Sequence, residues 1–297
     1  MQTAYKAVAI NNTKTIMLMT LFLGFVFGIG YLFAYLLEND AIFIGSIIFG
    51  VIVNILGLFI GDKIILTLNG AKEVNKQDLP EIYRMVENLA ITAGLPQTPK
   101  VYLIQSSALN AFATGKSPKN SVVALTTGII EKLNKEELEG VIAHEISHIK
   151  NYDIRVMMIA TILAGIIAIM ADIFLRLSFF GNKDREKGNA IFFVIGFMLS
   201  FLAPLFAQLI TLAISRKREF MADASGALLT RNPDGLASAL EKISGANIPL
   251  NVSPATAHLF IVNPFKDKKG FINWLGNIFS SHPPIEERIK ILRSMII

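Results

Sequence analysis

The sequence contains no cysteine, which excludes disulfide bonds, cysteine nucleophiles and metal sites built from thiolates. Charged residues are also scarce, at 17% of the 297 residues, whereas hydrophobic residues make up 53%. This composition is too apolar for an ordinary soluble domain. We therefore expect a membrane protein, and any metal site in it must be built from histidine and carboxylate side chains.

Four long apolar blocks carry most of the hydrophobic residues: 15–37, 41–60, 154–177 and 190–214. Each is about as long as a helix must be to cross a bilayer, roughly 20 residues. The first block is too long for a typical secretory signal and lacks a small-residue cleavage site, so we interpret it as an uncleaved anchor. For the last two blocks the alternative is a pair of buried core helices. The pattern favours about four transmembrane helices in two hairpins.

Basic residues flank these blocks on one side of the expected membrane. Lys14 precedes the first block, Lys63 follows the second, and residues 216–218 (Arg-Lys-Arg) follow the fourth, whereas the link at 38–40 is acidic. Basic flanks mark the cytoplasmic side, so we expect both termini and both long polar segments there. Attraction of the basic residues to anionic headgroups of the lipid bilayer then explains the net charge of +5, and we expect no nucleic-acid partner.

The apolar blocks divide the chain into four parts: a hairpin (1–65), a mixed segment (66–150), a second hairpin (151–214) and a final segment (215–297). In the mixed segment, the pattern predicts a helix from Pro80 to about Gly94, strands at 101–104 and 121–125, and a turn at 115–120. The predicted fold is mostly α, with an α+β unit split by the second hairpin. A short link makes that hairpin antiparallel, so residues just before 154 and just after 214 should lie close together.

The pentapeptide His144-Glu145-Ile-Ser-His148 holds two of the four histidines. Asn134 and Glu137 form a capping pattern, and apolar residues follow at helical spacing, so the pentapeptide lies on a predicted helix. Residues four apart share a helix face, so His144 and His148 can bind one metal ion. Glu145 then lies where it can accept a proton from water. The alternative is a chance arrangement on a solvated helix face.

A catalytic zinc ion usually has three protein ligands, so a third ligand must come from elsewhere. The candidates in the sequence are Asp153, Glu219, Asp223, His258 and His282. The hairpin argument favours Glu219, which follows the fourth apolar block, over a simple ion pair with a neighbouring arginine. Asp223, one turn later, can accept a hydrogen bond from a ligating histidine ring, or it can be a surface carboxylate. His258 is interpreted as a loop residue.

The helix with its HExxH motif entering a span, followed by an ExxxD pair after the next span, resembles the HtpX-type membrane zinc endopeptidases, which are related to the CAAX prenyl proteases. The resemblance covers the whole chain. It implies a zincin-like protease unit in the bacterial cytoplasmic membrane, with its active site on the cytoplasmic side. It also implies one Zn²⁺ per chain bound by His144, His148 and Glu219, with Glu145 as general base. The implied substrates are membrane proteins or peptides, especially damaged or misfolded ones.

Two further residues gain a role from the resemblance. Asn110 would hold the main chain of a substrate beside an edge strand, although it can also be a simple turn residue. His282 would lie near the zinc ion and stabilise the oxyanion or guard the metal at rest, although it can also cap the following helix. Two other functions stay open: a non-catalytic zinc-binding membrane scaffold and a divalent-metal transporter. The uncharged first two blocks argue against the transporter.

Overall fold

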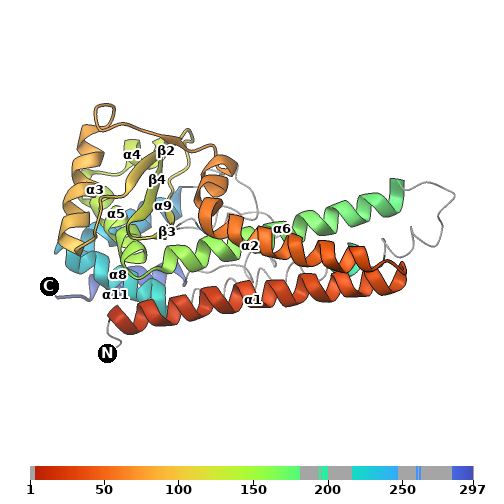
Figure 1. Ribbon diagram of the computed structural model, residues 1–297. Coiled ribbons are helices and arrows are strands. Elements are labelled where there is room, and N and C mark those ends of the chain that lie inside the picture. Colours follow the sequence, from red (N-terminus) through yellow and green to blue (C-terminus); the bar gives the residue numbers. More distant parts are fainter. Residues whose placement is uncertain are drawn as a thin grey trace.

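The computed structural model describes residues 4–180, 194, 196–199, 216–246, 259, 261 and 283–296, with side chains from residue 8 to residue 176 in the first of these ranges. A globular α/β part lies at one end of three long helices that run side by side (Figure 1). The start of α1 and the last helix, α11, both lie at this globular end.

The three long helices are α1 (Ala4–Leu36), α2 (Asp40–Leu68) and α6 (Asp153–Phe180). Each is long and apolar enough to cross a membrane. Asn39 begins α2, because its side chain accepts a hydrogen bond from the Ala41 N–H at 3.1 Å. The first three predicted blocks are thus helical. The predicted link at 181–188 and all but five residues of the fourth block (194 and 196–199 excepted) lie outside the described residues.

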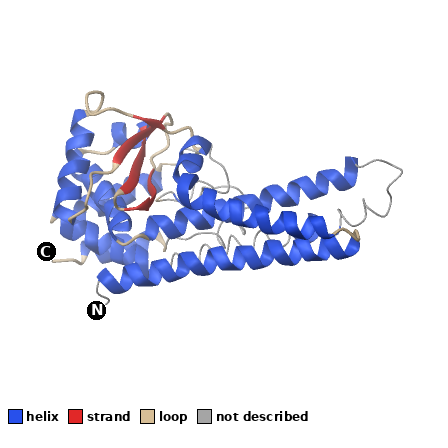
Figure 2. Ribbon diagram, viewed as in Figure 1, coloured by secondary structure: helices blue, strands red, loops and turns tan. Residues whose placement is uncertain are grey.

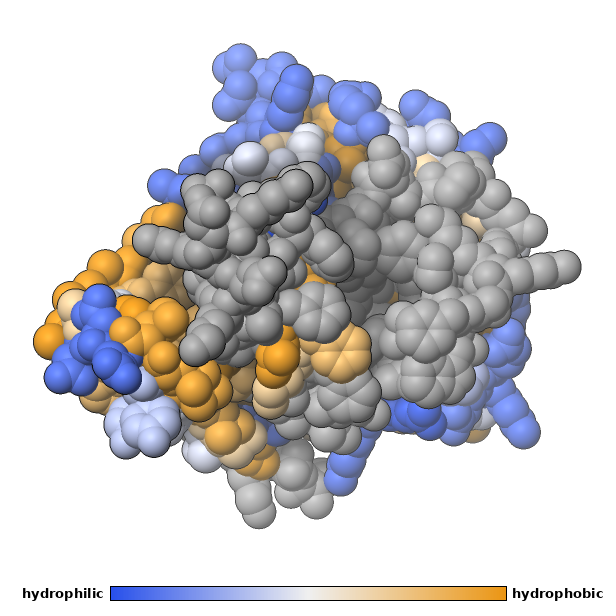
Figure 3. All heavy atoms as spheres, turned by 90° about the vertical axis from the view of Figure 1, so that its right-hand side faces the viewer, coloured by the Kyte–Doolittle hydropathy of each residue, from blue (hydrophilic) through white to orange (hydrophobic). Residues whose placement is uncertain are grey.

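The long helices expose apolar side chains outward and pack closely on one another inward. Ile16, Ile48 and Phe59 are 65%, 55% and 58% exposed, which suits a hydrocarbon environment and not water. Inward, Gly57 and Gly61 of α2 let the backbone approach α6, as small residues do in membrane helices. Figure 3 looks along these helices from their far end and shows apolar surface gathered over their described part.

The globular part contains a four-stranded sheet with the order β1-β2-β4-β3 (Figure 2). Its strands are β1 (Lys72–Glu73), β2 (Lys100–Ile104), β3 (Ala111–Ser117) and β4 (Asn120–Thr126). Strands β2 and β4 are parallel, with Val101 opposite Val123, and the other two pairs are antiparallel. The central pair therefore corresponds to the two predicted strands, each slightly longer than predicted.

Both faces of this sheet are covered by helices. On one face, Val123 and Leu125 of β4 join a core formed with α3 (Pro80–Ala93) and α5 (Lys135–Lys150). On the other face, Val122 and Ala124 join a core formed with the long helices. The alternation of side chains along one strand thus connects the two hydrophobic cores.

The sheet differs from the prediction on both sides of the central pair. Residues 115–120 were predicted to be a turn, but β3 continues through Ser117 and the turn narrows to 118–119. The reason is Gly115, which has a φ of 139° at a bulge where an added Cβ would lie 2.3 Å from the Asn120 carbonyl oxygen. Strand β1 was not predicted, because two exposed residues carry no alternating pattern.

Helix α5 is the centre of the globular part. The remaining helices are α4 (Thr127–Lys132), α8 (Arg216–Thr230), α9 (Pro233–Gly245) and α11 (Ile285–Arg293). Gly140 of α5 lies against the backbone of Leu236 in α9, and Gly226 of α8 lies against the backbone of His144. Two close helix crossings therefore hold α5 in place, one of them at the expected metal-binding residue.

Candidate metal centre

The local structure of α5 follows its sequence. Asn134 and Glu137 form the predicted capping box, with hydrogen bonds of 2.9 and 2.8 Å between each side chain and the other residue's N–H. The helix ends at Lys150, and α6 begins three residues later. Between them Tyr152 has a φ of 62°, so α5 does not continue straight into α6 but meets it at a sharp joint.

Three side chains from α5 and α8 converge at one buried point. The Nε2 atoms of His144 and His148 lie 3.1 Å apart, and carboxylate oxygens of Glu219 lie 3.7 and 3.5 Å from them. One potential ligand atom from each residue lies within 4.8 Å of the others, and all three residues are buried. The proximity expected from the second hairpin is therefore present, and Gly226 makes it possible because it lets α8 approach α5.

A second layer of carboxylates orients both imidazole rings. His144 Nδ1 lies 2.9 Å from Asp223 Oδ1, and His148 Nδ1 lies 3.1 Å from Asp153 Oδ2. When both Nδ1 atoms donate to these carboxylates, both Nε2 atoms present lone pairs toward each other and toward Glu219. These buried lone pairs and the carboxylate charge repel one another, so the three side chains fit as ligands of one shared cation.

The charges around the site shift two pKa values in opposite directions. Burial lowers the pKa of His148, but the carboxylates of Glu219 and Asp153 outweigh it and raise the pKa to about 9. Burial raises the pKa of Asp223, but the guanidinium of Arg288 outweighs it and lowers the pKa to about 2. In the metal-free protein, a proton on His148 thus takes the place of a cation.

We expect metal uptake to release this proton. Below about pH 9 the metal-free protein carries a proton on His148 that a metal ion must displace, so the apparent metal affinity should rise with pH by up to tenfold per unit. The same raised pKa stabilises the metal-free fold fully below about pH 6.5 and progressively less as the pH rises through 9. Calorimetric zinc titrations in two buffers of different ionisation enthalpy measure the released proton. An affinity that is constant between pH 6.5 and 9 would contradict this prediction.

Arg288 is the most important site residue that the sequence did not reveal. It is fully buried, and its Nε and Nη2 atoms bind the two Asp223 oxygens at 2.8 and 2.7 Å. Its Nη1 atom lies 4.0 Å from Glu219 Oε2. The signal was its spacing on α11, since Ile285, Arg288 and Leu292 share one buried face. An arginine on the apolar face of a helix needs a buried partner.

The acidic residues around the site each have a distinct partner in the structure. Arg218 pairs with Asp153 and not with Glu219. Asp223 is 1% exposed, so it is not a surface carboxylate. Asp153 contacts a ring nitrogen of His148 from outside the three-ligand group, so it serves as the partner of a histidine and not as the third ligand.

Asn110 lies at the start of the edge strand β3. It is 4% exposed, and its main chain is paired with Thr126 through its N–H and carbonyl at 3.1 Å each. Its side-chain oxygen accepts a hydrogen bond from the Ala111 N–H at 3.1 Å. The Ala111 carbonyl in turn accepts one from the Ile261 N–H at 3.4 Å, so the chain itself occupies part of this edge. His282 and His258 lie outside the described residues.

Known proteases resemble this chain over its whole length. The protease HtpX homolog of Dictyoglomus thermophilum is 42% identical over 302 residues, which cover 99% of this chain and 95% of the relative. The protease HtpX homolog of Caldanaerobacter subterraneus subsp. tengcongensis is 43% identical over 306 residues, which cover 100% and 99%. The whole length of this chain therefore corresponds to a membrane protease of this type.

The fold also resembles a solved structure, the crystal structure of S. mikatae Ste24p. That likeness has a TM-score of 0.52 at 23% identity and covers 94% of this chain and 65% of Ste24p. The model of peptidase family M48 matches residues 76–296, which include α5, α8 and α11. Family, relatives and the buried His-His-Glu group agree, and the chain belongs to peptidase family M48 as a membrane metalloprotease.

Proposed function

We propose that this protein is a zinc-dependent endopeptidase that cuts membrane proteins, especially damaged or misfolded ones, at the cytoplasmic face of a bacterial cytoplasmic membrane. The observation that carries the proposal is the position of the His144–His148–Glu219 group. The partner of His148 is Asp153, the first residue of the long apolar helix α6. The reacting peptide bond would therefore lie close to the end of a membrane span.

Two imidazole nitrogens and one carboxylate oxygen are the protein ligands of many catalytic zinc sites, and we propose one Zn²⁺ per chain. When bound, zinc supplies Lewis-acid chemistry, because it polarises a carbonyl group and makes water acidic near neutral pH. His144, His148 and Glu219 would hold it. Asp223 and Asp153 would keep both rings in the tautomer that presents Nε2.

Glu145 is the proposed general base. It follows His144 on α5, is 4% exposed, and lies close enough to contribute to the raised pKa values of His148 and Arg288. Its carboxylate would accept a proton from the attacking water as the water oxygen bonds to the carbonyl carbon. It would then deliver that proton to the leaving nitrogen as the C–N bond breaks, which gives a carboxylic acid and an amine. This role needs a residue beside the ligands, which is where the motif places it.

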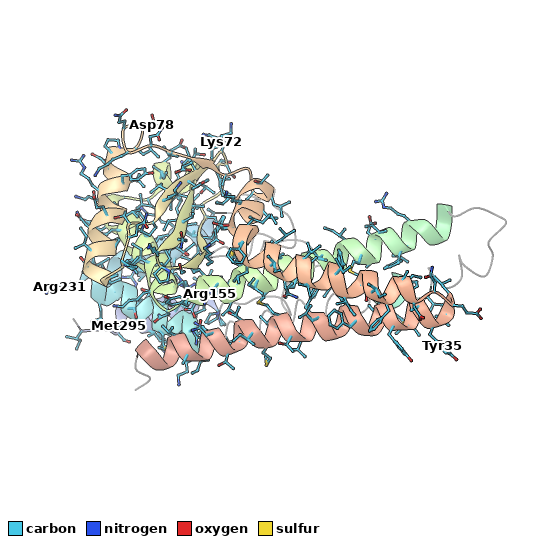
Figure 4. The ribbon with its side chains drawn as sticks, viewed as in Figure 1. Tyr35, Lys72, Asp78, Arg155, Arg231 and Met295 are labelled. Carbon is cyan, nitrogen blue, oxygen red and sulfur yellow. The ribbon has the colours of Figure 1, made fainter. Side chains whose placement is uncertain are left out.

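The proposed orientation rests on the distribution of charge along α1. Lys14 lies at the site end of α1, and the acidic link with Glu38 lies at the other end. Tyr31 and Tyr35 of α1 are 63% and 74% exposed near that far end, where Figure 4 shows Tyr35, as expected of an interfacial aromatic belt. The tyrosines mark a membrane boundary, and the charge difference supports a cytoplasmic active site.

We propose that the substrate binds as an extended segment along β3, with Asn110 at the entrance of the strand. Main-chain pairing with a sheet edge suits substrates of varied sequence. Such a segment would compete with the Ile261 N–H for the Ala111 carbonyl. We also propose that His282, which precedes α11, stabilises the oxyanion or guards the metal at rest.

A scaffold or a metal transporter fits the observations less well. A transporter would carry ionisable side chains inside its spans. Residues 15–60, which form most of the first two spans, contain no charged side chain apart from Glu38 and Asp40 at their connecting link. A scaffold would not need a buried carboxylate at Glu145 beside the ligands. Family membership also favours a peptidase over both.

The proposal is tested with the full chain reconstituted in vesicles together with a membrane-protein substrate that carries a tag on each side. Treatment with a chelator is expected to abolish cleavage, and one zinc ion per chain is expected to restore it. The expected cut lies on the side that holds His144. A zinc-loaded protein that leaves the substrate intact, or cleavage that survives metal removal, would refute the proposed function.

A further inference from the structure

The first membrane helix contacts the metal centre directly. Asn11 of α1 is 1% exposed, and its Nδ2 atom donates to Asp153 Oδ1 and to the Asn151 carbonyl oxygen, at 2.7 Å each. Asn11 lies outside residues 76–296, the part of the chain that the family model matches. A residue with no place in the family's peptidase segment therefore binds the carboxylate that orients a metal ligand.

The two oxygens of Asp153 have different partners. Oδ2 accepts from His148 Nδ1 at 3.1 Å, whereas Oδ1 is bound by Asn11 and by Arg218. The carboxylate is therefore held between three elements, α1, α5 and α8, at the first turn of α6. Loss of the Asn11 contact would leave Oδ1 bound by Arg218 alone, so the carboxylate would be held less firmly against the His148 ring.

The other contact of Asn11 fixes the joint between α5 and α6. The Asn151 carbonyl belongs to the C-cap residue of α5, next to Tyr152 and its φ of 62°. One amide group thus spans the joint, because it donates on one side to Asn151 and on the other to Asp153. A buried amide costs free energy unless its donors are satisfied, and an apolar residue would serve a plain membrane anchor better.

The neighbouring residue makes a parallel connection to the sheet. Asn12 accepts a hydrogen bond from Arg155 Nη1 at 2.9 Å, and Arg155 Nε donates to the carbonyl of Lys116 in β3. Figure 4 shows Arg155 beside the start of α6. Two adjacent asparagines of α1 thus connect it to Asp153, the partner of the ligand His148, and through Arg155 to the edge strand proposed to bind the substrate.

We infer that α1 is a working part of the catalytic centre and that Asn11 is a positioning residue, which fixes Asp153 so that His148 presents Nε2 to the metal. The inference deepens the proposed function, because it concerns the same site. It assigns to a membrane helix the role that an outer hydrogen-bond partner has in metal sites. The hydrogen bonds from Asn11 to Asp153 and Asn151 are the basis for this role.

The test compares zinc affinities of the purified full chain in detergent, measured by competition with a chelator. Asp153→Ala is expected to weaken zinc binding on the order of 10- to 100-fold, as loss of an outer partner of a ligating histidine does. Asn11→Leu, which keeps the branching at Cγ but removes both N–H donors, is expected to weaken it roughly tenfold. In the double variant, Asn11→Leu should add nothing, because its effect passes through Asp153.

Thr15→Val is the matched control. Thr15 lies one turn further on the same face of α1, is buried, and only bonds the backbone of its own helix at 2.9 Å. It should leave zinc affinity unchanged. If Asn11→Leu does not fold, Asn11→Asp keeps the shape, replaces the donor with an acceptor, and should weaken zinc binding as well.

Unchanged affinity in the Asn11 variants would overturn the inference. So would an effect of Asn11→Leu that is equal with and without Asp153, since a general loosening of the fold would act in both backgrounds. Failure of the proposed function looks different. A wild-type protein that binds zinc but cuts no peptide would refute the function, whereas the affinity cycle, which needs no substrate, would still be readable.

Discussion

Replacing Glu145 with glutamine is expected to lower the rate of peptide cleavage by about 10²- to 10⁴-fold while zinc stays bound. Glutamine has nearly the same shape but cannot accept the proton of the attacking water. The ligand group of His144, His148 and Glu219 is untouched by this change. Cleavage of a tagged membrane substrate and zinc content per chain, measured on the same preparation, separate chemistry from metal binding.

Glu136→Gln is the matched control for this change. Glu136 lies in the first turn of the same helix, α5, and is exposed to solvent. It should keep the wild-type rate and the wild-type zinc content. If Glu145→Gln cuts as fast as the wild type with zinc bound, Glu145 is not the base and another residue must take the proton.

Replacing Arg288 with methionine is expected to destabilise the fold by about 3–5 kcal/mol. Arg288 is fully buried and binds both oxygens of Asp223, so its removal leaves a carboxylate charge in the core without its guanidinium partner. Asp223 also holds the ring of His144, so zinc affinity should fall as well. Chemical unfolding in detergent and chelator competition measure the two effects.

The same helix offers a control for this prediction. Arg293 of α11 pairs with Glu241 at 2.9 Å, but both side chains are largely exposed to water, so Arg293→Met should change stability very little. Adding Asp223→Asn to Arg288→Met should recover part of the lost stability, because the unpaired charge disappears. Equal unfolding midpoints for the two arginine variants would show that the buried pair does not stabilise the fold.

Sequence patterns predicted those helix ends that are determined by neighbouring residues. Pro80 and Gly94 bound α3 as expected, with Gly94 as its left-handed cap at a φ of 72°. The capping box at Asn134 and Glu137 begins α5. Glu219 followed from topology alone, since a hairpin returns the chain to its starting point. These predictions needed only a window of sequence or the connectivity of two spans.

The parts that sequence reasoning missed depend on contacts between distant residues. Asn11 and Asp153 are 142 residues apart, and Asp223 and Arg288 are 65 residues apart. Nothing within one helix specifies such a partner, because each side chain is placed by how the helices cross. Asp153 was considered as a ligand, but only the joint at Tyr152 turns it toward the outer nitrogen of His148.

The two faces of the sheet are buried by two different groups of helices. The side chains on one face of β4, including Val122, pack against the long apolar helices. Those on the other face, including Val123, pack against α5. Removal of the long helices would expose the apolar face of the sheet that carries Val122 and Ala124. The long helices therefore serve both as candidate membrane spans and as one of the two layers that bury the sheet.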